Sequence, residues 1–132
     1  MDALEMSADF KVSPERLYKA WIDGEGHSAF TGASASVEAR VGGEHTAWDG
    51  YIQGVTLELE PNRRIVQSWR TTEFPEDSPD SRLEVILEAV KGGVRITLHH
   101  TDIPDGQAEM YREGWEDYYF KPMRAYFEGE SA

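Results

Sequence analysis

The sequence predicts an α+β fold. A curved antiparallel sheet of about six to seven strands wraps around a long C-terminal helix, with two short helices after the first strand. Three observations predict this fold. Large aromatic side chains recur at three- and four-residue spacing over residues 107–127, which is the spacing of one face of a helix. Residues 33–101 consist of short alternating segments separated by turn signals, and a helix-start signal precedes them at residues 13–16. We expect residues 1–132 to form a single domain, because a chain of this length suits one core.

The N-terminal part combines one strand with two short helices. Apolar and polar residues alternate over residues 4–12, which predicts a half-buried strand. Ser13 suits the N-cap of the next helix, because its hydroxyl accepts hydrogen bonds from exposed backbone N–H groups, and Pro14 suits the first helical position. This helix is expected to end near residues 23–24. A second helix is expected over residues 25–31, closed by Gly32.

Six further strands are expected, with short connections between them. The turn signals are Gly-Gly, Asp-Gly and Pro-Asn pairs, together with an acidic loop over residues 74–81. Consecutive strands joined by short turns favour an antiparallel meander. In the last strand, His100 has the same parity as Ile96 and Leu98 and is expected to point inward. The expected strands are 37–41, 44–48, 51–60, 64–72, 82–90 and 94–101.

The C-terminal helix carries most of the aromatic residues. Asp105 is expected to cap its N-terminus, and Pro122 is expected to kink or break it near residues 119–122. Phe120 and Phe127 fall off the main stripe, so they are expected on the rim of the sheet or in an exposed patch used for dimerisation. The residues of the stripe are Ala108, Tyr111, Trp115, Tyr118, Tyr119, Pro122 and Tyr126.

The composition argues against several classes of protein. The chain has 25 acidic and 13 basic residues, a net charge of −12, which disfavours binding to a nucleic-acid backbone. It has no cysteine, so disulfides are excluded. No secretory signal and no apolar run of about 18 residues occur, so we expect a cytoplasmic protein without membrane insertion. No feature of the sequence requires a cofactor, and none predicts the oligomeric state.

Several segments, taken in order, resemble the START-like (SRPBCC, helix-grip) superfamily. Residues 12–21 resemble its first strand-to-helix junction. The later segments are similar to one branch of it, the family named for the activator of heat-shock protein 90 ATPase and its homologues. The resemblance spans nearly the whole chain, and the order of the motifs is its specific part. The later segments are residues 42–43, 54, 57–66, 69, 98–101 and 114–119.

The resemblance implies a START-like domain in which the sheet grips the helix, with a cavity between them and the two short helices plugging one end. Members of the superfamily bind lipids, hormones or polyketides, so we expect a small hydrophobic or amphipathic ligand in the cavity. Such pockets are mainly apolar and carry a few placed polar groups. The alternative is that the aromatic rings only fill the core. The candidate ligand-binding residues are Trp48, Tyr51, Trp69, His100, Trp115, Tyr118 and Tyr119.

Two other functions stay open. Co-chaperones of this branch act on heat-shock protein 90-type chaperones, so the second function is protein interaction through the acidic loop over residues 74–80. The third is cyclase- or hydrolase-type chemistry with His100 and a tyrosine as proton-transfer groups, against a purely structural role for His100. No nucleophile motif occurs, and no catalytic residue is assigned. His99 and His100 face opposite sides of a strand, so we expect no metal site.

Overall fold

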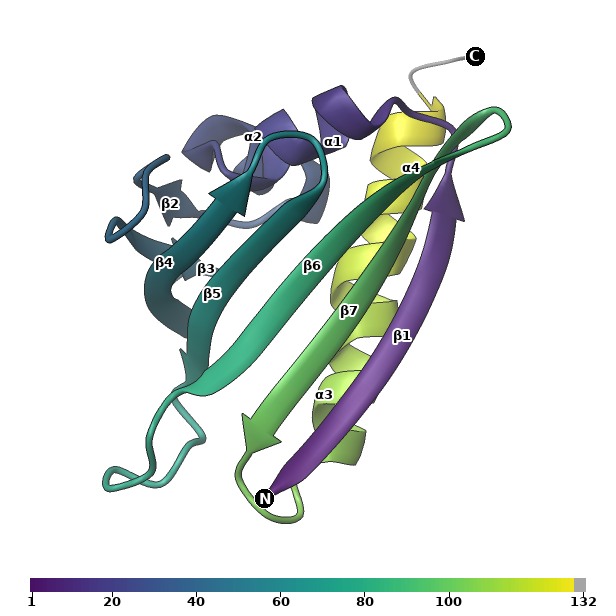
Figure 1. The fold of residues 1–132 in the computed structure, drawn as a ribbon. Coiled ribbons are helices and arrows are strands. Elements are labelled where there is room, and N and C mark those ends of the chain that lie inside the picture. The colour runs from purple at the N-terminus through teal and green to yellow at the C-terminus, as the bar shows by residue number, and fades with distance from the viewer. Residues whose placement is uncertain (130–132) are drawn as a thin grey trace.

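A seven-stranded antiparallel sheet forms one layer of the molecule, and the helices lie on its concave side (Figure 1). The computed structural model describes residues 1–129. The strand order is β1-β7-β6-β5-β4-β3-β2, so the first strand of the chain pairs with the last one. The elements are β1 (Asp2–Phe10), α1 (Pro14–Trp21), α2 (Gly24–Thr31), β2 (Ser36–Val37), β3 (Glu44–Ala47), β4 (Ile52–Glu60), β5 (Arg64–Thr71), β6 (Ser81–Val90), β7 (Gly93–Ile103), α3 (Ala108–Gly114), the π-helix η1 (Trp115–Phe120) and α4 (Lys121–Gly129).

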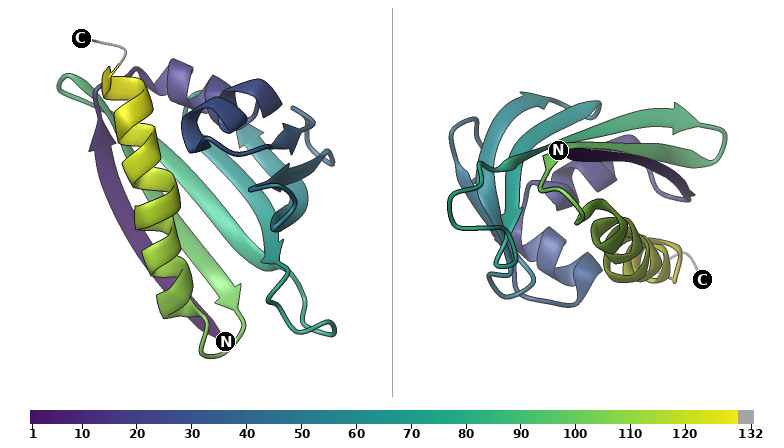
Figure 2. Two further views of the ribbon diagram at one scale, coloured as in Figure 1. Left: turned by 180° about the vertical axis from the view of Figure 1, so that it is seen from behind. Right: turned by 90° about the horizontal axis from the view of Figure 1, so that it is seen from below.

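The sheet curls around the C-terminal helix, as the view along that helix shows (Figure 2). Register shifts occur in β1 between Asp2 and Leu4 and in β4 between Thr56 and Glu58, and irregularities of this kind increase the local twist of a sheet. This is the helix-grip arrangement, and it confirms the predicted fold class. Of the expected inward residues in β7, Ile96, Leu98 and His100 are all fully buried.

The strand expected over residues 37–41 is wrong for most of its length, because only Ser36 and Val37 pair with β3. The following residues turn instead. The N–H of Arg40 donates to the carbonyl of Glu38 at 2.8 Å, and the N–H of Gly43 donates to the carbonyl of Arg40 at 3.0 Å. These hydrogen bonds between near neighbours form turns, so an extended strand cannot continue there.

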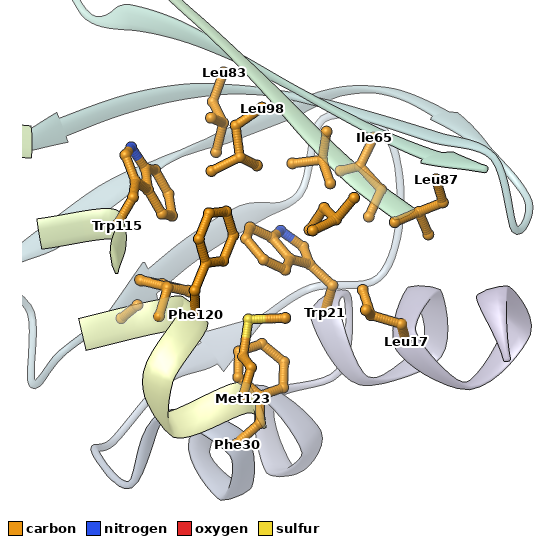
Figure 3. Close-up of a cluster of buried hydrophobic side chains, with 14 of the residues drawn as sticks. Leu17, Trp21, Phe30, Ile65, Leu83, Leu87, Leu98, Trp115, Phe120 and Met123 are labelled. Atoms are coloured by element: carbon orange, nitrogen blue, oxygen red, sulfur yellow. The ribbon is translucent and has the colours of Figure 1, made fainter. Parts of the chain in front are cut away.

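Both short helices are capped at their N-termini, the first by Ser13 as expected and the second by Asp23. The Ser13 hydroxyl accepts from the N–H of Arg16 at 3.2 Å, and the Asp23 carboxylate accepts from the N–H of Gly26 at 3.0 Å. Gly32 ends the second helix in the left-handed region, with φ +83°, where a residue without Cβ is favoured. Both helices direct apolar side chains under the sheet, and Trp21 of α1 lies among the core residues drawn in Figure 3.

The C-terminal helix contains one extra residue, which moves its buried face. In a continuous α-helix, positions 118, 119, 122 and 126 follow Trp115 on one face. The wider turn of the π-helix η1 contains one additional residue, so each later position of the buried face lies one residue further along the sequence. Tyr118 is 60% exposed, whereas Phe120 and Phe127 are each 1% exposed. The predicted stripe is therefore wrong for Tyr118, which is exposed, and for Pro122 and Tyr126, which are only partly buried, whereas Tyr119 is buried as expected. The expected rim or surface position of Phe120 and Phe127 is wrong for the same reason. The buried face consists of Tyr111, Trp115, Tyr119, Phe120, Met123 and Phe127.

Two details at the ends of this segment also differ from expectation. The helix begins at Ala108 with Gln107 as the N-cap, so Asp105 lies too far from the first turn to cap it. Its carboxylate instead binds the N-terminal amine of Met1 at 2.7 Å. The irregularity expected near residues 119–122 lies earlier, over Trp115–Phe120. Because Pro122 has no backbone N–H to donate, the wider turn before it is compatible with the missing hydrogen bond.

Among the described residues, no helix has the length and apolar character needed to cross a membrane.

Candidate functional site

A pocket of about 380 Å³ lies between the C-terminal helix and the β3–β5 part of the sheet. Its walls come from the turn after β3, from strands β4 and β5, and from the helical segments α3 and η1. The volume falls within the range of small-molecule sites, which is roughly 300–1,000 Å³. The lining residues are Trp48, Tyr51, Ile52, Trp69, Met110, Tyr111, Gly114, Trp115, Tyr118 and Tyr119.

Six of the seven residues expected to bind a ligand lie in this lining, and His100 is the one that does not. Sequence reasoning missed Ile52, Met110, Tyr111 and Gly114. Tyr111 belonged to the aromatic stripe and could have been found from it. Gly114 gives no signal without a structure, because a glycine marks a pocket only through what surrounds it. Whether the lining residues bind a ligand stays a prediction.

Aromatic rings pack against one another along the inner wall of the pocket. The ring centroids of Trp69 and Trp115 are 5.6 Å apart, and those of Trp115 and Tyr119 are 4.6 Å apart. At the exposed side, Trp48 meets Tyr118 edge-on with centroids 5.5 Å apart. Because the rings hold each other from different elements, the wall is formed before any ligand arrives.

Trp48 occupies an unusual position in the turn between β3 and β4. Its φ is +52°, and Asp49 and Gly50 that follow also have positive φ, at +58° and +91°. Non-glycine residues seldom adopt this region. The indole Nε1 of Trp48 is buried and has no hydrogen-bond partner among the described residues. The turn therefore holds a large side chain at the pocket in a strained conformation.

His100 lies behind the aromatic wall and is fully hydrogen-bonded. Its Nδ1 accepts from the indole N–H of Trp115 at 3.2 Å. Nε2 therefore carries the proton and donates to the Ser81 hydroxyl at 2.8 Å, and Ser81 donates onward to the carbonyl of Trp69 at 2.6 Å. Burial lowers the pKa of His100 to about 3, so the ring is neutral. This geometry fits a structural histidine that fixes two tryptophans of the wall.

A second buried histidine holds Tyr119 from the other side. His27 Nδ1 donates to the carbonyl of Trp21 at 3.0 Å, because a carbonyl can only accept. Nε2 is then the acceptor and receives the hydroxyl proton of Tyr119 at 2.7 Å. Burial lowers the pKa of His27 to about 4 and raises the pKa of Tyr119, so both groups are neutral. His27 and His100 thus have opposite tautomers.

Hydroxyl groups gather at the end of the pocket near the start of α3. Tyr51 donates its phenol proton to the carboxylate of Glu73. Tyr111 donates to Oε1 of Gln107 at 2.8 Å and lies 2.6 Å from the hydroxyl of Thr71. Burial, with the hydrogen bond to Glu73, raises the pKa of Tyr51 to about 12. This polar end can orient one end of a ligand, while the rest of the lining is apolar.

No lining residue is an acid, a base or a histidine, so the pocket itself offers contact surface and hydroxyl groups for binding. Among residues 1–129, no group of three or more histidine, cysteine, aspartate or glutamate side chains is placed to hold a metal ion. The arrangement suits recognition of a largely apolar molecule.

Comparison with known proteins places this geometry in context. Residues 11–128 match the sequence family described as "Activator of Hsp90 ATPase homolog 1-like protein". The chain is 31% identical over 124 residues to the human protein named activator of 90 kDa heat shock protein ATPase homolog 1, which covers 94% of this chain and 36% of that protein. The chain thus spans about a third of the length of such curated relatives.

Two solved structures extend the similarity to the fold. The first, described as an HSP90 activator from Plasmodium falciparum, is 26% identical, with a TM-score of 0.82 over 90% of this chain and 91% of that chain. The second is a protein from Chromobacterium violaceum, 25% identical, with a TM-score of 0.77 over 96% of each chain.

Proposed function

The chain belongs to the family of Activator of Hsp90 ATPase homolog 1-like proteins, and we propose that it binds a small hydrophobic or amphipathic ligand between its sheet and its C-terminal helix. The observation that carries the proposal is Gly114. This glycine lies within the C-terminal helix and lines the pocket, and a Cβ built on it meets no atom within 4 Å. Glycine inside a helix costs about 1 kcal/mol relative to alanine. A destabilising residue that enlarges an apolar pocket is consistent with selection for the space.

The rest of the site supports the same function. Trp48 and Trp69 face the helix from different strands or turns, and Tyr118 and Tyr119 approach from the helix itself. Burying a ligand against such rings gives about 25 cal/mol for each Å² of apolar surface removed from water. His100 acts indirectly in this proposal, because it fixes Trp115 without lining the pocket. The same position argues against His100 as a proton-transfer group on a ligand.

The proposal is tested by blocking the pocket. Gly114→Leu places a side chain into the open space, and Arg112→Leu places the same side chain on the exposed side of the same helix. Native mass spectrometry of protein purified from cells detects a co-purified ligand, and uptake of the neutral dye Nile red measures the free pocket. We expect wild type and Arg112→Leu to take up dye and Gly114→Leu to lose uptake. No bound molecule and no dye uptake in wild type would contradict the function.

A second function rests on the relatives rather than on the pocket. Proteins similar to this chain are named for activation of the heat-shock protein 90 ATPase, so the second candidate is binding to such a chaperone. The loop over residues 74–80 is the proposed contact. Its backbone is fixed, because Arg70 donates to the carbonyls of Pro75 and Ser78 and to the carboxylate of Asp80. Phe74, the first residue of the loop, is buried, so the contact would come from the exposed acids Glu76 and Asp77.

This second function has its own experiment. The chain is used to pull down a heat-shock protein 90-type chaperone at low salt, and the chaperone's ATPase rate is then measured with and without it. We expect association that weakens with salt and with Glu76→Lys. Absence of association at low salt would remove this function and leave ligand binding untouched.

A further inference from the structure

We propose that the pocket selects a positively charged ligand, an alkylated ammonium group on an apolar body, with Glu73 as its counter-charge. This inference rests on the proposed ligand binding and adds the chemical class of the ligand. Two independent observations support it, the aromatic character of the lining and an acid without a cationic partner at its polar end.

The lining is an arrangement of aromatic rings without a basic residue. Seven of its ten residues are tryptophan or tyrosine, and the other three are Ile52, Met110 and Gly114. The face of an aromatic ring carries negative electrostatic potential and attracts a cation placed within roughly 6 Å, most strongly for tryptophan. Cages of several such rings are a common way to bind quaternary ammonium groups. An anionic ligand finds no counter-charge on these walls.

Glu73 supplies a negative charge at the polar end of the pocket. Its carboxylate accepts the phenol proton of Tyr51, and no lysine, arginine or histidine among residues 1–129 forms an ion pair with it. Asp80, further along the chain, differs in this respect, because its carboxylate lies 2.9 Å from Nη1 of Arg70. Glu73 thus keeps its charge available to a bound cation.

The position of Glu73 is fixed by backbone hydrogen bonds to Thr71 and Gln107, two residues that also bond to Tyr111 of the lining. Its N–H donates to the hydroxyl of Thr71 at 3.1 Å, and its carbonyl accepts from Nε2 of Gln107 at 3.0 Å. Gln107 in turn accepts the phenol proton of Tyr111. Since Tyr51 gives its proton to Glu73, its oxygen is left as an acceptor toward a ligand. The oxygen of Tyr111 already accepts from the hydroxyl of Thr71 at 2.6 Å, because Tyr111 gives its own proton to Gln107. Acceptors favour a ligand with a positive or hydrogen-donating end.

The charge around the pocket is negative, like that of Glu73. The chain carries a net charge of −12. Glu113, Glu116 and Asp117 are exposed on the helix between the lining residues, and of these only Asp117 has a basic partner among the described residues, Lys121 at 3.2 Å. The surrounding potential therefore attracts a cation toward the pocket and repels a carboxylate or phosphate.

Three probes of matched shape test the charge preference. They are 3-hydroxyphenyltrimethylammonium, its neutral isostere 3-tert-butylphenol, and the anion 3-hydroxybenzenesulfonate. Binding is followed by the tryptophan indole N–H signals in NMR spectra. We expect the cation to bind about fivefold or more tightly than the neutral isostere, with an advantage that shrinks as salt is added, and the anion to bind weakest.

Variants then assign the counter-charge. Glu73→Gln keeps the shape of the side chain and removes its charge. It should lower the affinity for the cationic probe by roughly fivefold and change the affinity for 3-tert-butylphenol by less than about twofold. Glu76→Gln, at an exposed acid in the same loop, is the matched control and should change neither probe. The proposed preference for a cation is wrong if the neutral probe or the sulfonate binds as tightly as the cation, or if the two variants have the same effect. In either case the proposed ligand binding is unaffected. If none of the probes binds and Nile red is also excluded, both proposals are wrong.

Discussion

The indole N–H of Trp115 donates to Nδ1 of His100 across 3.2 Å and ties the C-terminal helix to strand β7. The bond fixes the tautomer of the histidine, whose other nitrogen then donates to Ser81. Ser81 completes the chain by donating to the carbonyl of Trp69. Two tryptophans of the pocket wall are thus held by a buried polar network in which every member has a partner. Such networks specify one arrangement and are destabilising when a member is lost.

Replacing His100 should strongly destabilise the fold. His100→Ala leaves the Trp115 N–H without its acceptor and opens a cavity, and each of these effects is unfavourable in a buried site. We expect the free energy of unfolding to fall by roughly 3 kcal/mol or more, measured by urea denaturation. His99→Ala is the matched control, because His99 lies on the outer face beside Glu5, and it should change stability by less than about 0.5 kcal/mol. Equal effects of the two variants would contradict the role of the network.

Stability should decrease as pH falls below about 6.5. The pKa of His27 in the folded state is about 4 and that of His100 about 3, and burial lowers the pKa of His45 as well. Between the ordinary value of about 6.5 and these values, the unfolded chain binds protons that the folded chain does not. The stability contributed by the neutral rings is therefore complete above pH 6.5 and is lost progressively toward the folded-state values. From pH 7 to pH 5 the loss should be roughly 2 kcal/mol for each of His27 and His100.

The same prediction has a direct spectroscopic check. NMR titration of the imidazole signals should show that His27 and His100 stay neutral from pH 7 to pH 5, and that they occupy opposite tautomers. A normal titration of either ring in this range would contradict the assigned burial and bonding.

The π-helix predicts an asymmetry between deletion and insertion. Deleting the exposed Asp117 removes the extra residue, so that Trp115 and the later core residues fall on one face of an ordinary α-helix. We expect this variant to fold with a small loss of stability. Inserting an alanine after Asp117 rotates Met123 and Phe127 out of the core and should lower the free energy of unfolding by roughly 3 kcal/mol or more. Thermal unfolding followed by circular dichroism compares the two variants, and equal losses of stability would contradict the predicted asymmetry.

Filling the space at Gly114 with a single methyl group should stabilise the protein. Gly114 has helical angles, φ −63° and ψ −43°, and an added Cβ meets nothing within 4 Å. Gly114→Ala should therefore raise the free energy of unfolding by about 1 kcal/mol. Urea denaturation measures the change. Gly54→Ala provides the contrast, because its Cβ would lie 1.9 Å from the carbonyl oxygen of Ser68 and should destabilise the β4–β5 pairing. Loss of stability in Gly114→Ala would mean that the space is not free.

Much of the candidate site was accessible from the sequence, because the rings are large and recur at regular spacing. Trp69, Trp115 and Tyr119 were among the candidate residues named once the resemblance implied a cavity, and all three line the pocket. His100 was predicted to point inward, and it does. The parity of a residue shows which face of the sheet its side chain is on, but it does not show whether that side chain reaches the pocket. It therefore did not show that His100 lies behind the aromatic wall of the pocket.

By itself, the sequence determined the α+β class, the order of strands and helices, and the cap at Ser13, because these depend on neighbours a few residues apart. Only the tertiary structure decided the face of the helix after Trp115. Periodicity assumes a constant number of residues per turn, and one added residue in η1 changes every later position. The space at Gly114 was likewise decided by packing, since an open volume depends on residues from the turn after β3, from β4 and β5 and from the helix, which meet only after folding.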